Sequence, residues 1–235
     1  GEHITLIGNG LGERMCYFNY FESLLHLRYP AEAITVRNNS KSGDTAGFRP
    51  HPARASAWAF PGAEKFNAKR NDHHGNGFFP TPDEWLKQLQ TDTVIAFFGY
   101  NESFEGQAGL SDFKNELDAF VKYTQTQNYN GKGAPRLVLV SPTAYEDLSK
   151  KKDLPNGVTE NANLRLYRDA MREVAEQNKV GFVDLLTPTE ELAKPKDTDF
   201  TINGFSLSDW GYRQLAPTLA DAVSGKPAIR SEADA

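Results

Sequence analysis

Hydrophobic residues along the chain fall into two alternating patterns. Five short apolar runs, rich in β-branched residues, are typical of buried strands. They cover residues 4–7, 33–36, 94–98, 137–140 and 180–183. Between these runs, apolar residues recur three or four positions apart, which predicts amphipathic helices. The helices cover residues 11–29, 83–89, 161–178 and 212–223, and a further helix begins with an N-cap at Ser111. The alternation predicts an α/β/α sandwich around a mainly parallel five-stranded sheet.

Residues 44–80 follow neither pattern. They are rich in Gly, Pro and Asn and hold three of the five histidines, with room for a short helix within 54–66. An irregular segment of this length is typical of a functional loop or a poorly ordered one. Four of its aromatic residues either form a wall for stacking sugars or anchor the loop to the core: Trp58, Phe60, Phe78 and Phe79.

Composition narrows the classes of protein. The chain has 235 residues, which fits one domain over residues 1–225 followed by a tail over 226–235. A net charge of -5 disfavours a nucleic-acid partner, because phosphate binding needs a basic face. No apolar run approaches the roughly 20 residues that a transmembrane helix needs. The chain begins with Gly1 rather than Met, so its lack of a signal peptide is not evidence of a cytoplasmic setting.

Polar and glycine residues cluster where the predicted strands end. In parallel α/β sheets ligands bind beyond the carboxyl ends of the strands, so these segments should meet at one edge. The segments are residues 8–11 (Gly-Asn-Gly-Leu), 38–43 (Asn-Asn-Ser-Lys-Ser-Gly), 99–103 (Gly-Tyr-Asn-Glu-Ser) and 203–209 (Asn-Gly-Phe-Ser-Leu-Ser-Asp). They are the candidate functional edge of the molecule.

In this order, the four segments resemble the conserved blocks of the SGNH (GDSL-like) hydrolase superfamily, from Ile4 to about Val223. The resemblance implies a flavodoxin-like α/β/α fold and ester hydrolysis by serine, aspartate and histidine. The residues of the blocks are most similar to those of a bacterial subgroup found as one module of larger exported proteins. That similarity implies a periplasmic or extracellular setting and further domains in a longer parent chain.

By the same resemblance, the three triad positions hold Gly10, Asn203 and Ser206. Gly10 has no side chain to attack a carbonyl, Ser206 cannot act as a base near neutral pH, and Asn203 carries no charge. The oxyanion donors implied by the family are the backbone N–H groups of Gly10 and Ser40 and the side-chain amide of Asn101. The resemblance therefore predicts a binding pocket that lacks the catalytic nucleophile, as in a pseudoenzyme.

Three functions remain open at this point. The first is an SGNH-type domain with a degenerate active site that binds a glycan, an acylated ligand or another small molecule without efficient catalysis. The second is an active esterase that uses relocated residues. Its candidate nucleophiles are Ser42, Ser103 and Ser206, its candidate bases are His51, His73 and His74, and Glu102 and Asp209 are candidates to orient the base. The third is a structural module that spaces or docks other domains.

Other motifs predict no cofactor and no metal. Asp72-His73-His74 has no further ligand at a recognisable spacing. Glycines at 8, 10 and 12 do not have the spacing of a dinucleotide-binding loop. Cys16, the single cysteine, excludes an intramolecular disulfide and is expected to be a small buried residue of the first helix.

Overall fold

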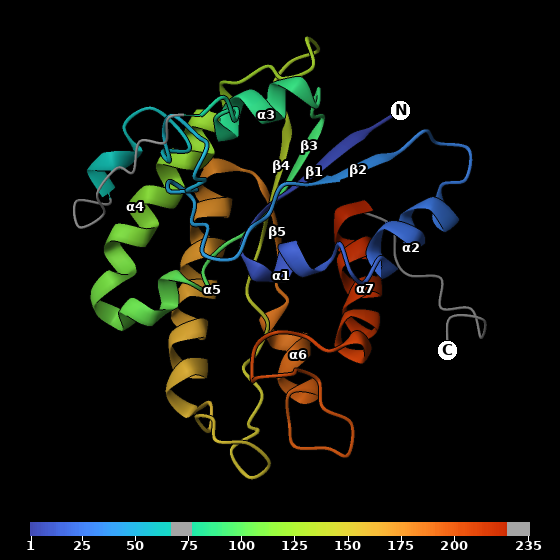
Figure 1. The fold of residues 1–235 in the computed structure, drawn as a ribbon, viewed down its shortest axis with the longest axis vertical. Coiled ribbons are helices and arrows are strands. Elements are labelled where there is room, and N and C mark those ends of the chain that lie inside the picture. Colours follow the sequence, from blue (N-terminus) through green and yellow to red (C-terminus); the bar gives the residue numbers. More distant parts are fainter. Residues whose placement is uncertain (67–76, 225–235) are drawn as a thin grey trace.

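A five-stranded sheet with all strands parallel forms the centre of the molecule (Figure 1). The structure is a computed structural model that describes residues 1–66 and 77–224. The strands are β1 (His3–Gly8), β2 (Thr35–Asn38), β3 (Thr93–Phe97), β4 (Arg136–Val140) and β5 (Gly181–Val183), in the spatial order β2-β1-β3-β4-β5. This architecture confirms the predicted α/β class, and it brings the carboxyl ends of all five strands to one edge.

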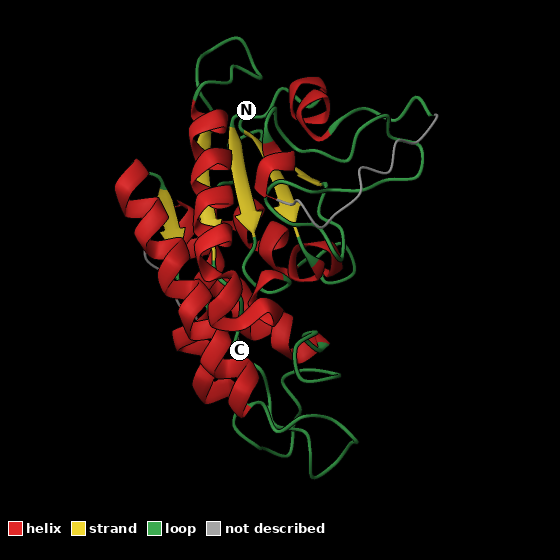
Figure 2. Ribbon diagram, turned by 90° about the vertical axis from the view of Figure 1, so that its left-hand side faces the viewer, coloured by secondary structure: helices red, strands yellow, loops and turns green. Residues whose placement is uncertain are grey.

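Helices cover both faces of the sheet, as Figure 2 shows in side view. The α-helices are α1 (Gly10–Arg14), α2 (Tyr20–Arg28), α3 (Pro82–Gln88), α4 (Gly106–Gln125), α5 (Val158–Asn178), α6 (Leu186–Leu192) and α7 (Asp209–Ser224). Two short 3-10 helices are η1 (Ala63–Phe66) and η2 (Glu102–Glu105). None of the helices within residues 1–66 and 77–224 combines the length and apolarity needed to span a membrane.

The hydrophobic core has two halves, one on each face of the sheet. On β3, Ile95 and Phe97 pack with α2 and α7, whereas Val94 and Ala96 pack with α4 and α5. All five residues of β3 are buried, so the strand appears in the sequence as a continuous apolar run rather than an alternating one. The sandwich thereby fixes where the strand ends lie and where any ligand must approach.

The structure corrects two of the predicted helices and adds a third. Residues 11–29 form two helices, because the chain turns between Met15 and Asn19 before α2 begins. Cys16 lies in that break and is exposed, so its predicted burial was wrong. Helix α4 begins at Gly106, which places Ser111 inside the helix rather than at its N-cap. Helix α6 was not predicted.

The first part of the irregular segment is packed firmly against α4. Gly47 N–H donates to the buried Glu116 carboxylate over 3.1 Å. The buried Arg49 guanidinium lies 5.4 Å from the Phe98 ring centre and 5.2 Å from that of Phe120. Arg49 also donates to two carbonyls of its own loop. Since a buried cation with this many partners is costly to displace, the loop is a fixed part of the domain.

Candidate functional site

The first strand leads into a short helix that begins with a glycine. Asn9 caps α1 by accepting a hydrogen bond from Leu11 N–H over 3.1 Å, and Gly10 is the first residue of the helix. The turn therefore keeps the backbone of a helix N-terminus at the strand end, as the cap favours. No side chain projects from position 10, so this turn supplies no nucleophile.

The segment after β2 is held by the side chain of Asn38. Its amide donates to Gly12 O over 2.7 Å, and its oxygen accepts from Ser40 N–H over 3.0 Å. The Ser40 N–H, an expected oxyanion donor, is thus engaged with Asn38 in this structure. The Ser40 hydroxyl is buried and has no partner among the described residues.

Ser42 lies against the space left by Gly10. A Cβ on Gly10 would stand 2.9 Å from Ser42 Oγ. The Ser42 hydroxyl donates to Glu13 Oε2 over 2.5 Å, and Ser42 N–H donates to the same oxygen over 2.9 Å. The next residue, Gly43, has a φ of +91° and no atom within 4 Å of the place a Cβ would take, so its backbone borders open solvent. The structure thus brings a hydroxyl, a carboxylate and an open backbone together beside Gly10.

The segment after β3 is connected to the same loop through Asn101. Its side-chain amide donates to Asp44 O over 2.9 Å. An amide nitrogen carries two hydrogens, so one donor of Asn101 is left for another acceptor. Ser103 is buried, and its hydroxyl donates to Tyr100 O over 2.7 Å, which closes the turn. Ser103 is therefore a turn residue here.

The carboxyl group of Asp44 has an unusual environment. Only 5% of the residue is exposed, and burial raises the pKa of its carboxyl from 3.8 to about 7. Arg49, Arg54 and Lys41 act in the opposite direction but do not cancel the desolvation. Such a group changes its charge near neutral pH, which is a property found at many functional sites.

The last block has become a structural turn. Asn203 Oδ1 accepts from Ser206 N–H over 2.8 Å and from Phe205 N–H over 3.3 Å, and Ser206 O accepts from Ile202 N–H. The Phe205 ring stacks on Tyr100 with centroids 4.2 Å apart. Beneath this pair the cavity at the ends of β3 and β4 is only about 10 Å³, which is room for roughly one water. Asn203 and Ser206 thus shape the chain here, and little space is left under this block.

The predicted histidine bases do not meet the candidate serines in the part of the chain that the structure describes. His51 stacks on Phe79 with ring centroids 3.8 Å apart, and its Nδ1 accepts from Ala53 N–H. Burial, with Arg54 and Lys41 nearby, lowers the pKa of His51. His73 and His74 lie outside the described residues. Within those residues no three His, Cys, Asp or Glu side chains are grouped to hold a metal ion.

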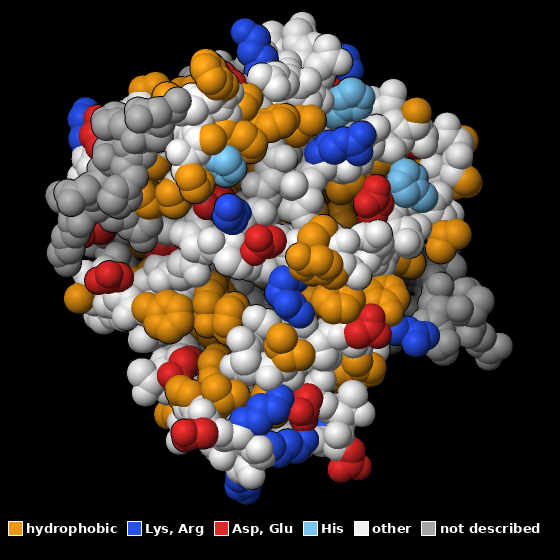
Figure 3. Space-filling model, in the orientation of Figure 1, with side chains coloured by type: hydrophobic (Ala, Val, Ile, Leu, Met, Phe, Trp, Pro, Cys, Tyr) orange, Lys and Arg blue, Asp and Glu red, His pale blue; other side chains and the backbone are white. Residues whose placement is uncertain are grey.

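The aromatic wall predicted in the long loop is divided between two places. Trp58 and Phe60 line a surface groove next to α4. Phe79 packs between His51 and Trp85, and Phe78 is fully exposed. On the face shown in Figure 3, charged side chains of both signs are interspersed with small hydrophobic groups rather than gathered by sign.

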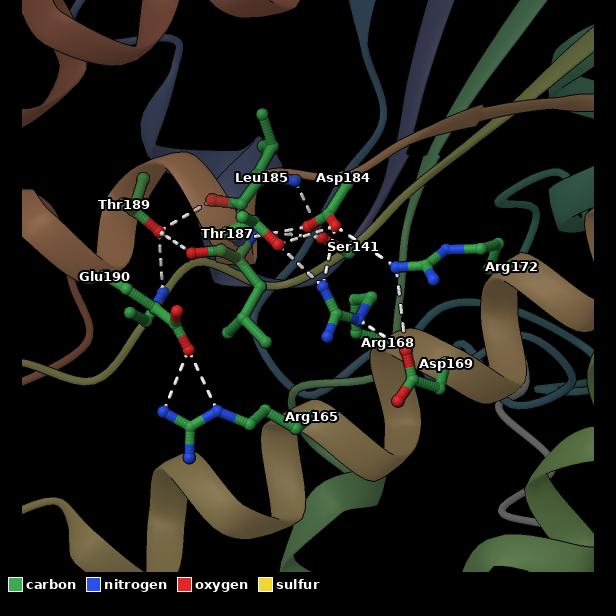
Figure 4. A network of polar contacts seen from close by, with 12 residues as sticks. Ser141, Arg165, Arg168, Asp169, Arg172, Asp184, Leu185, Thr187, Thr189 and Glu190 are labelled. Carbon is green, nitrogen blue, oxygen red and sulfur yellow. Dashed lines mark hydrogen bonds and ion pairs between the residues drawn. The ribbon is translucent and has the colours of Figure 1, made fainter.

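A second polar cluster lies at the ends of β4 and β5 (Figure 4). Arg168 of α5 pairs with Asp184 over 2.6 Å and donates to Thr187. The buried Ser141 hydroxyl accepts from Leu185 N–H over 2.8 Å and donates to Pro142 O over 3.0 Å. Because Ser141 Oγ is already engaged in both directions, this cluster connects α5 to the start of α6 rather than offering a nucleophile.

Comparison with known proteins agrees with this architecture. The family model for GDSL-like lipases and acylhydrolases matches residues 7–214. The chain belongs to this family. No curated protein matches the chain.

Solved structures of family members share the fold at low sequence identity. A catalytic mutant of an acetylxylan esterase from Geobacillus stearothermophilus has a TM-score of 0.64 and 17% identity, covering 99% of this chain and 98% of its own. Another acetyl xylan esterase has a TM-score of 0.63 and 13% identity, with 94% and 99% covered. A lipase/acylhydrolase from Enterococcus faecalis has a TM-score of 0.60 and 16% identity, with 98% and 100% covered.

The sequence analysis missed two carboxylates, those of Glu13 and Asp44, that lie at this GDSL-like edge. Glu13 lies one helical turn after Gly10, and this spacing was an available signal for a side chain on the same face. Asp44 directly follows Gly43, but no pattern in the sequence indicates that its carboxyl is buried. The stacking of Phe205 on Tyr100 joins segments about a hundred residues apart and had no local signal either.

Proposed function

We propose that this domain binds an ester-bearing small molecule or glycan at the strand-end edge around Gly10 and Asn101, without hydrolysing it efficiently. The observation that carries the proposal is which residues occupy the expected triad positions and what they contact. Gly10 offers no side chain, while Asn203 and Ser206 bond into a turn that seats Phe205 on Tyr100. Acyl transfer by the usual route of the family lacks its nucleophile, its base and its orienting carboxylate.

The remaining groups suit recognition of an ester carbonyl. The backbone at Gly43 is open, and Asn101 keeps a second N–H. Two of the structural neighbours are acetyl xylan esterases, which favours an acetylated plant-type glycan as the ligand class. Such polymers lie outside cells, so a periplasmic or extracellular setting, as one module of a longer chain, is part of the proposal.

Turnover of short-chain aryl esters by wild type and by Asn101→Ala tests this function. We expect no turnover above the buffer rate for either protein. Hydrolysis at an ordinary enzymatic rate, lost in Asn101→Ala, would refute the non-hydrolytic proposal, because the oxyanion donor would then serve a working nucleophile.

A second candidate function rests on the contact between Ser42 and Glu13. Ser42 Oγ stands beside the space where the family serine would project, and Glu13 accepts its hydrogen bond over 2.5 Å. In this scheme Ser42 Oγ bonds to the acyl carbon, and the bond from that carbon to the leaving alcohol oxygen breaks. Glu13 takes the hydroxyl proton and passes it to the alcohol, and water then cleaves the acyl-serine.

A fluorophosphonate probe separates the two candidates. The acyl-transfer scheme predicts one adduct, on the peptide that contains Ser42, and its formation should fall at least about tenfold in Glu13→Gln. Ser103→Ala is the matched control and should label like wild type. If intact-mass spectrometry finds no adduct on folded wild type, the second candidate is eliminated and the binding function stands.

A further inference from the structure

A wide groove lies apart from the GDSL-like edge. It is bordered by η1, by the start of α3 and by the last turns of α4, in the upper left part of Figure 1, whereas α1 lies at the centre. The groove has a volume of about 510 Å³. That size is within the range of small-molecule sites and far above the 10 Å³ cavity beneath Phe205.

Aromatic rings form the floor of the groove. Trp58 is partly exposed there, and Phe60 stacks on Tyr123 with centroids 5.9 Å apart. Large rings of this kind present flat apolar faces with a polar edge, which suits the apolar face of a pyranose ring. Phe60 itself is buried, so Trp58 and Tyr123 are the rings that a ligand would touch.

Carboxylates supply hydrogen-bond acceptors at the rim. Asp83 accepts from Tyr129 Oη over 2.7 Å, which holds its side chain in place. Burial and the neighbouring Asp83 raise the pKa of Tyr123 to about 12, so its hydroxyl keeps its proton. Glu64 lies at the opposite rim and is exposed. Ionised carboxylates only accept hydrogen bonds, so they select a ligand rich in hydroxyl donors.

The charge of the groove lining favours neutral ligands over anionic ones. Its lining includes Asp83 and Glu64 and contains no Lys or Arg among the described residues. Lys65 Nζ lies outside the lining, 3.9 Å from the place a Cβ on Gly62 would take. The two carboxylates of the lining therefore make the groove less favourable for a uronate or a sulfated sugar than for a neutral one. A neutral polyhydroxylated chain matches both the acceptors and the rings.

Trp58 is also held in a fixed position before any ligand arrives. Its ring meets Phe48 edge-on at 5.1 Å, and the two residues form an antiparallel bridge. The backbone N–H of Trp58 donates to Ser56 Oγ over 3.2 Å. The loop that carries it is anchored by Arg49 and Glu116. A ligand therefore finds the ring already ordered, which lowers the entropic cost of binding.

We propose that this groove binds a neutral oligosaccharide, with Trp58 as the stacking platform and Asp83 as an acceptor for sugar hydroxyls. It is separate from the edge at Gly10 and does not depend on ester chemistry. In this arrangement the groove binds the glycan chain, whether the GDSL-like edge only binds an ester or also hydrolyses it.

Tryptophan fluorescence tests the proposal directly, because the chain has three tryptophans. Xylohexaose and cellohexaose are titrated into wild type, Trp58→Phe, Trp85→Phe and Trp210→Phe, with a galacturonate hexamer as the charged comparison. A neutral hexasaccharide should change the fluorescence of wild type, Trp85→Phe and Trp210→Phe, and the change should vanish in Trp58→Phe. By calorimetry, Trp58→Ala should bind at least about tenfold more weakly, and Asp83→Asn should also weaken binding.

Several results would overturn this inference. The first is no change in fluorescence with either neutral hexasaccharide up to about 10 mM. The second is an equal loss of affinity in Trp58→Ala and Trp85→Ala, and the third is tighter binding of the galacturonate hexamer than of the neutral sugars. The fourth is a change in fluorescence when calcium chloride is added alone, without a sugar. Asn101→Ala should bind the hexasaccharide like wild type. That variant keeps the two proposals distinguishable. If the proposal for the Gly10 edge is wrong, hexasaccharide binding in the groove is still expected, and if the proposal for the groove is wrong, the expected results of the ester assays do not change.

Discussion

Two regions of the same edge are held in place by different kinds of contact. Around Gly10 and Asn101 the side chains that shape the edge bond to backbone: Asn9 to Leu11 N–H, Asn38 to Gly12 O, and Asn101 to Asp44 O. Those bonds stabilise the fold whether or not chemistry occurs at this edge. In residues 203–206, by contrast, the side chains expected to act on a substrate now hold their own turn.

The comparison shows that the shape of the strand ends and the shape of the loop are fixed by different parts of the molecule. The first region is set by β1, β2 and β3, whose register is fixed by a buried sheet. The second is a loop, and its shape depends on its own residues and on Glu146, which accepts from Thr201 N–H and Phe200 N–H. The strand ends are therefore the more constrained of the two regions, and the loop is the more tolerant of substitution.

The largest expected effect is gained activity. If the first region still has catalytic geometry, the triple variant Gly10→Ser, Asn203→Asp, Ser206→His should hydrolyse aryl esters about 10²-fold faster than wild type. The new serine must displace Ser42, because a Cβ at position 10 comes 2.9 Å from Ser42 Oγ. Initial rates with a chromogenic acetate measure the gain, and Gly10→Ser alone serves as the control that should show none. A folded triple variant no faster than wild type would mean that the first region has changed as well.

The next effect concerns stability and Asp44. Burial favours the protonated carboxyl in the folded state and raises its pKa from 3.8 to about 7. The folded protein therefore binds more protons between about pH 4 and pH 7, so stability falls as pH rises through that window and stays low above it. Asp44→Asn should be more stable than wild type at pH 8, by at most about 4 kcal/mol, and the difference should shrink toward pH 4. Urea unfolding across pH 4–8 measures it, and a difference independent of pH would contradict the account.

The smallest effect concerns the turn in the second region. Asn203→Ala removes the acceptor for two backbone N–H groups and should lower the free energy of unfolding by about 1 kcal/mol. Asn203→Asp keeps an oxygen in the same place and should change it by less than about 0.5 kcal/mol. Chemical denaturation of the two variants provides a matched pair. Equal stability of both with wild type would show that this side chain does not hold the turn.

The sequence predicted the sheet well because buried parallel strands are continuous apolar runs, as in β3. It could not show the break between α1 and α2, since Met15, Phe18 and Phe21 all pack against the core and recur every three residues across it. Similarly, the resemblance located Gly10, Asn101 and Ser206 as edge residues. The bond from Ser40 N–H to Asn38 is local, because Asn side chains often accept from the backbone two residues on. The burial of Asp44, in contrast, follows from tertiary contacts that no local pattern encodes.

The central claim is that this edge of a GDSL-like fold binds without efficient hydrolysis. It is tested most directly by NMR of the isotope-labelled protein with an acetylated xylo-oligosaccharide, following the protein amides and free acetate in one sample. The account predicts saturable shifts of the Gly43 backbone and Asn101 side-chain signals, with acetate released no faster than in buffer. Release of many acetates per protein molecule, at a rate proportional to protein concentration, would contradict it.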